Sequence, residues 1–130
     1  MAYRYEWSDG GGIYAGGSAL VTDNLIYDNS AVTGGGICIL SGRLLNNTLV
    51  GNSADLEPDW GYGGNVYASF GYDYTRLIVA NNLICNAGAG AGIFWANAGG
   101  DVIRFNNVWG NTPSDYGMQD PRDYEVVYGE

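Results

Sequence analysis

Carboxylates are the side chains of this sequence best suited to chemistry. Among 130 residues the chain has 14 Asp and Glu, five Arg, no Lys and no His. Glycoside hydrolysis needs two carboxyl groups about 5.5 Å or roughly 6.5–9.5 Å apart, and so many acids on a small surface produce such pairs by chance. Without His, a Ser-His-Asp triad and a His-ligated metal site are excluded. We therefore expect a non-catalytic binding or scaffold module that self-associates. The alternatives are a carbohydrate-active enzyme (polysaccharide lyase or glycoside hydrolase), or a fragment of one, and a purely structural spacer from a longer adhesin.

One group of acids has the spacing of cation ligands. Asp55, Glu57 and Asp59 alternate around Pro58. Calcium loops use alternate carboxylates, but this segment lacks the central Gly and the terminal Glu of an EF-hand. A solvated acidic turn is the simpler interpretation, so we expect no metal ion and no cofactor.

Aromatic residues point more strongly to a binding site. Tyr14, Tyr67 and Phe94 each follow the first apolar residue of a Gly-rich strand, so they should point outward. Exposed aromatic patches mark interaction surfaces, and both sugar rings and protein partners stack on Tyr and Trp. A satellite core, a protein interface and a carbohydrate platform are the three interpretations. The candidate ligand-binding residues are Tyr14, Trp60, Tyr62, Tyr67, Tyr72, Tyr74 and Phe94.

A repeat must position these side chains. Each repeat has a Gly-rich turn, a short strand, a second strand, an Asn and a third strand. The Gly-rich strands start 24, 29 and 27 residues apart, at Ile13, Ile37, Val66 and Ile93. Such a period, with three short strands in each unit, is typical of parallel β-helix coils. The sequence therefore predicts an all-β fold, a right-handed parallel β-helix of about four coils, with an inserted loop region near residues 53–75.

The repeat also predicts which side chains stack on one another. Three inward columns are expected: Ile13, Ile37, Val66 and Ile93; Ala15, Ile39, Ala68 and Trp95; and Ile26, Leu49, Ile84 and Trp109. A ladder of amide side chains is expected at Asn24, Asn47, Asn82 and Asn107. Neighbouring coils lie about 4.8 Å apart, so identical Asn side chains can hydrogen-bond along the stack. The alternative is that Asn only marks turns.

The motifs GGGIY (residues 10–14) and NSA (residues 29–31 and 52–54) resemble repeats of the pectate-lyase-like superfamily. The likeness is greatest to adhesin-type Gly-Gly-Ile and Asn-Ser-Ala repeats and covers residues 10–117. It implies a right-handed β-helix from a secreted or cell-surface parent. The catalytic arrangements of that superfamily do not transfer. Its polygalacturonases use Asp clusters with a His, and its lyases use calcium-binding acids with an Arg or Lys base in motifs that this chain lacks.

The organisation predicted for the chain is a single domain, residues 1–130. Residues 1–9 form an N-terminal cap strand, residues 10–117 the repeats and residues 118–130 a C-terminal cap or tail. Two cysteines, Cys38 and Cys85, fall on different predicted sheets, so we expect free thiols.

Charge and hydropathy limit the partners. The net charge of −9 disfavours nucleic acid and anionic membranes, and should make neutral glycans preferred over uronates. No apolar run approaches the ~20 residues of a membrane span, and residues 1–12 lack the pattern of a signal peptide. Strand edges at the ends of a short solenoid template pairing. We therefore expect a homo-oligomer, a symmetric dimer through an end or an aromatic flank.

Overall fold

The computed structural model describes residues 8–54, 62–69, 76–96 and 102–118. Within these ranges every regular element is a β-strand, and every strand pair is parallel. None of the described residues forms a helix of the length and hydropathy needed to cross a membrane. The expected segments at residues 1–7 and 119–130, and the loops at residues 55–61 and 70–75, lie outside the described residues.

The strands form three main sheets. The first sheet runs in the order β1 (Ile13–Ala15), β5 (Ile37–Ile39), β9 (Val66–Ala68), β12 (Ile93–Trp95) and β15 (Tyr116–Met118). The second runs in the order β2 (Leu20–Thr22), β6 (Gly42–Leu45), β10 (Leu77–Ala80) and β13 (Val102–Arg104). The third runs in the order β3 (Leu25–Tyr27), β7 (Thr48–Val50), β11 (Leu83–Cys85) and β14 (Asn107–Trp109). A short pair joins β4 (Ser30–Ala31) to β8 (Ser53–Ala54).

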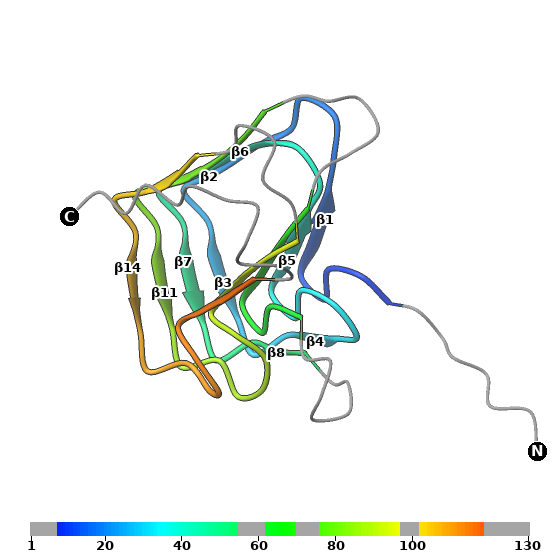
Figure 1. The fold of residues 1–130 in the computed structure, drawn as a ribbon. Helices are drawn as coiled ribbons and strands as arrows, with labels where there is room; N and C mark the ends of the chain where they lie inside the picture. Colours follow the sequence, from blue (N-terminus) through cyan, green and yellow to red (C-terminus); the bar gives the residue numbers. More distant parts are fainter. Residues whose placement is uncertain (1–7, 55–61, 70–75, 97–101, 119–130) are drawn as a thin grey trace, which may run out of the picture.

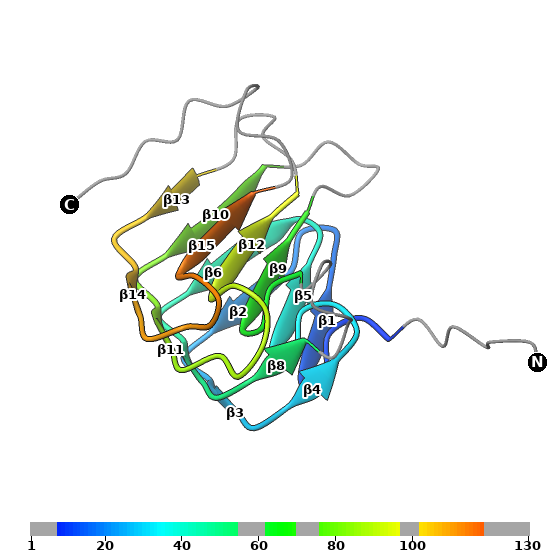
Figure 2. The ribbon, with the colours of Figure 1, turned by 60° about the horizontal axis from the view of Figure 1, so that its bottom comes forward.

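The chain visits these sheets in the same order on each pass, so each pass adds one strand to each sheet. Figure 1 shows β3, β7, β11 and β14 side by side, and Figure 2 shows the rows of the first and second sheets. This arrangement is compatible with a parallel β-helix. We call the edge formed by β1, β2 and β3 the first end, and the edge formed by β13, β14 and β15 the last end.

The core lies between the sheets because alternate residues of each short strand point inward. Its fully buried members include Ile37, Ile39, Leu44, Leu49, Val66, Val79, Ile84 and Ile93. Two predicted columns are confirmed by the strand register. Ile13, Ile37, Val66 and Ile93 pair in sequence, as do Ala15, Ile39, Ala68 and Trp95. These columns hold because the Gly-rich turns fix where each strand of the first sheet starts.

The third column is shifted by one residue from the prediction in the last repeat. Val108, not Trp109, pairs with Ile84 and packs against the core, whereas Trp109 pairs with Cys85 and is exposed. The amide ladder is shifted in the same way: Asn82 donates to Oδ1 of Asn106 at 2.9 Å, not to Asn107.

A turn conformation explains both shifts. The residue before each ladder amide has a positive φ: Asp23 (60°), Asn46 (57°), Asn81 (58°) and Phe105 (55°). Asp and Asn tolerate this left-handed conformation, whereas Phe rarely adopts it. The pair at residues 106–107 mimics the pair at residues 81–82 in sequence, but Phe105 occupies the left-handed position. Asn107 therefore becomes the first residue of β14 instead of the ladder amide.

Candidate functional site

The aromatic candidates lie on the outer face of the first sheet. Tyr14, Cys38, Tyr67, Phe94 and Gly117 occupy one register row after another, in β1, β5, β9, β12 and β15. Their neighbours on both sides along each of the first four strands point into the core, so this column faces outward. The sequence predicted that Tyr14, Tyr67 and Phe94 point outward, and the strand register agrees with that orientation.

Three aromatic rings meet in this column, and we call Tyr62, Tyr67 and Phe94 the aromatic cluster. The rings of Tyr67 and Phe94 are stacked, with centroids 6.0 Å apart and planes at 11°. Tyr62, which lies just before β9, presents an edge to both, at 4.7 Å from Phe94 and 6.0 Å from Tyr67. Offset and edge contacts at these distances are attractive and hold the rings in fixed orientations.

Gly117 leaves room for the ring of Phe94 at the end of the aromatic cluster. A Cβ atom at Gly117 would approach Cδ2 of Phe94 to 2.8 Å, which is closer than a real side chain allows. Phe94 therefore lies between the Tyr67 ring and the bare backbone of β15. All three cluster residues are half-buried, so each combines packing with an accessible surface.

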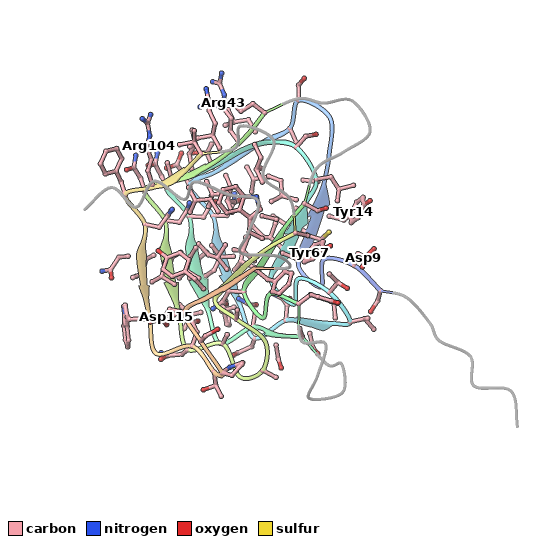
Figure 3. All side chains as sticks on the ribbon, in the orientation of Figure 1. Asp9, Tyr14, Arg43, Tyr67, Arg104 and Asp115 are labelled. Atoms are coloured by element: carbon pink, nitrogen blue, oxygen red, sulfur yellow. The ribbon has the colours of Figure 1, made fainter. Side chains whose placement is uncertain are left out.

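Tyr14 is not brought into the cluster. Its side chain is 57% exposed, and the row of Cys38 separates it from Tyr67. Two rows correspond to about 9–10 Å along the sheet. Figure 3 shows Tyr14 and Tyr67 on the same flank of the molecule, with Asp9 nearby. The remaining candidates Trp60, Tyr72 and Tyr74 lie outside the described residues, as do Asp55, Glu57 and Asp59.

Two titratable groups of this surface, Tyr67 and Cys38, have raised pKa values. Burial raises the pKa of Tyr67, and this outweighs the hydrogen bond with Ser69, which lowers it. Burial, with a smaller contribution from Asp9, raises the pKa of the Cys38 thiol to about 12. Below these raised pKa values the phenol and the thiol stay protonated. Cys38 is thus a poor nucleophile, because the thiolate is the reactive form.

These residues can bind a ligand in two ways: by stacking on their aromatic rings and by hydrogen bonds with the hydroxyl groups of the tyrosines. The described residues hold no group of three or more His, Cys, Asp or Glu side chains that could bind a metal ion. Cys38 and Cys85 are free and buried, on the first and third sheets, as the repeat predicted.

Except for Tyr14, the sequence interpretation missed a second set of residues. Among the described residues, the exposed large apolar side chains all lie at or beside one of the two ends. They are Tyr14, Leu20, Leu25 and Tyr27 at the first end, and Phe105, Trp109 and Tyr116 at the last. The signal in the sequence was an outward apolar residue in the first or last of the described passes, where no described strand lies on its outer side.

Comparison of the chain with protein-family models, with curated proteins and with solved structures gives no match.

Proposed function

We propose that this chain is a non-catalytic binding module on a right-handed parallel β-helix of about four coils, of the pectate-lyase-like kind. The repeated order of the sheets, the parallel register and the stacked amides support this fold. The aromatic cluster is the observation that carries the binding function, because it joins three oriented rings on a rigid sheet.

Neutral glycans are the ligands that suit this surface best. Sugar rings present C–H faces that stack on aromatic rings, and phenol hydroxyls supply hydrogen bonds to sugar hydroxyls. The strand rows, about 4.8 Å apart, repeat along one direction and suit an extended chain. The net charge of −9 repels uronates, so neutral chains are favoured over acidic ones. Stacking contributes about 1 kcal/mol per ring, which gives affinities roughly in the millimolar to high-micromolar range.

The test is an NMR titration of the protein with neutral oligosaccharides, with an oligogalacturonate for comparison. Backbone amide shifts should be confined to β9, β12 and the residues that precede them, and the acidic sugar should bind more weakly. Tyr67→Ala and Phe94→Ala should each reduce affinity at least fivefold, since each removes a stacking face. Tyr27→Ala is the matched control, because Tyr27 is equally aromatic, 59% exposed and on the third sheet.

Two results would oppose the glycan proposal. One is the absence of shifts with a broad panel of neutral glycans. The other is binding that is unchanged in both Tyr67→Ala and Phe94→Ala. Either result would make the aromatic cluster a packing feature of the outer face.

We also propose that the module self-associates as a homodimer. The exposed apolar residues at the ends support this second function, because isolated strand edges flanked by apolar side chains favour pairing with another chain.

A further inference from the structure

The amide ladder has a direction. Nδ2 of Asn24 donates to Oδ1 of Asn47 at 3.0 Å, Asn47 donates to Asn82 at 3.1 Å, and Asn82 donates to Asn106 at 2.9 Å. The backbone N–H of each donor residue bonds to the same Oδ1 atom. Each Oδ1 atom therefore receives its hydrogen bonds from the pass nearer the first end.

A second ladder runs in the same direction one turn further along each pass. Nδ2 of Asn29 donates to Oδ1 of Asn52 at 3.1 Å, Asn52 donates to Asn65 at 2.7 Å, and Asn65 donates to Asn111 at 2.9 Å. Asn111 donates to Oδ1 of Asp115 at 2.9 Å. A carboxylate only accepts, so Asp115 accepts the last hydrogen bond of this ladder and passes none on.

At the first end, each ladder ends in an acceptor that no residue of the described ranges uses. The pattern of the inner passes predicts two N–H donors for each Oδ1 atom of Asn24 and Asn29. Within the described part of the chain, neither atom accepts a hydrogen bond. The two acceptors belong to residues five positions apart in the sequence.

Apolar surface surrounds these acceptors. The first end has an open hollow of about 290 Å³, lined by Gly12, Ile13, Leu25, Ile26, Tyr27 and Asn29. Leu25 is 64% exposed and Tyr27 59% exposed, whereas Val50 in the row that follows Tyr27 is half-buried. The hollow is thus lined by inward residues of the first pass, such as Ile26, and its rim is formed by the exposed side chains of Leu25 and Tyr27.

We propose that the first end is a docking site for a separate polypeptide that carries the same strand–Asn–strand–Asn repeat and adds to β1–β3 in parallel. Such a segment presents two amides at the required spacing, each with a backbone N–H and an Nδ2–H to donate. Its inward apolar residues fill the hollow, as each inner pass does for the next. Two first ends facing each other would set Oδ1 against Oδ1, so this surface selects a donor-bearing coil over a second first end. The inference is independent of the aromatic cluster.

The probe is a fluorescently labelled peptide with the sequence of residues 34–54, carrying Cys38→Ser to prevent oxidation. Fluorescence anisotropy should show saturable binding of this peptide to the intact protein. A control peptide with Asn47→Asp and Asn52→Asp keeps the length and apolar residues but opposes carboxylates to the two acceptors. It should bind at least tenfold more weakly, because two hydrogen bonds of about 1 kcal/mol each are lost.

Two protein variants locate the site. Leu25→Glu places a charge on the rim of the hollow and should weaken peptide binding at least fivefold. Trp109→Glu is the matched control at the opposite end of the same sheet and should leave peptide binding unchanged; circular dichroism checks that both variants fold. The proposal is overturned if neither peptide binds, if both bind equally, or if Leu25→Glu and Trp109→Glu have the same effect.

Discussion

Removal of the Asn65 amide is the sharpest test of the stacked-amide architecture. Asn65 is fully buried and accepts hydrogen bonds from Nδ2 of Asn52 at 2.7 Å and from its backbone N–H at 3.3 Å. In Asn65→Ala, Cys85 O keeps its bond from Gly51, and Asn111 Oδ1 keeps its bond from Ala87. The buried N–H of Asn52 loses its partner. The Nδ2 group of Asn52 also loses a hydrogen bond, and the missing side chain leaves a cavity. We expect these three effects together to lower the free energy of unfolding by about 3 kcal/mol.

A second substitution makes this prediction specific to the ladder. Ala87 has the position in its pass that Asn29, Asn52 and Asn111 have in theirs, one residue after a left-handed turn residue. Ala87→Asn in the Asn65→Ala background should place an amide in the vacated space and restore at least half of the lost stability. Asn29→Ala, at the half-buried outer rung, should lose only about 1 kcal/mol because its Oδ1 has no donor to strand.

Equilibrium unfolding in urea, followed by circular dichroism, measures these differences. With a slope of roughly 2 kcal/mol per molar urea, 3 kcal/mol corresponds to a midpoint shift of about 1.5 M. A loss below about 1 kcal/mol for Asn65→Ala would refute the stacked amide as a stabilising unit. A double variant no more stable than Asn65→Ala would show that Ala87 does not share the ladder position.

Two further predictions concern the last end. Trp109→Glu should weaken self-association at least tenfold in sedimentation velocity, because it places a charge where an exposed apolar side chain lies at the last end; a wild-type protein that stays monomeric at high micromolar concentration would contradict this. Phe105→Asn should raise the free energy of unfolding by about 1 kcal/mol, because Asn relieves the φ of 55° at the loss of a weak contact with Arg104. Thermal unfolding measures the second effect, and an unchanged or lower Tm would count against strain at Phe105.

The sequence predicted the parallel all-β arrangement and the inward columns of the first sheet, because Gly-rich turns and alternating residues are local signals. It misplaced the last amide and the last apolar residue of the third column by one residue each. Asn106 and Asn107 are adjacent, so the repeat can be aligned on either one. The left-handed backbone at Phe105 places Asn106 at the ladder position. A bulky aromatic residue in that conformation is an exception to the preference from which sequence reasoning proceeds.

The second ladder shows where a repeat pattern stops being informative. Asn65 replaces the amide that Ala87 lacks, but it comes from the Gly-rich turn and lies 13 residues from Asn52, outside the period. Similarly, the aromatic cluster depends on a ring–ring contact by Tyr62, which belongs to no strand. Both contacts are tertiary, so they follow from which chain segments meet across passes and not from spacing along one pass.

The division between inward and outward positions explains why the fold is easier to derive than the binding surfaces. Inward and turn positions must repeat, since each side chain stacks on its equivalent in the next pass; Ile37, fully buried between Ile13 and Val66, has little freedom to vary. Outward positions carry no such requirement, and the outer column of the first sheet changes from Tyr14 to Cys38 to Tyr67 within three rows. Outward positions are therefore free to take residues suited to binding, and Tyr67 and Phe94 of the aromatic cluster lie at such positions. The first end follows the opposite logic, because there the repeating pattern itself leaves two acceptors that no described residue uses, and these are the basis of the proposed docking site.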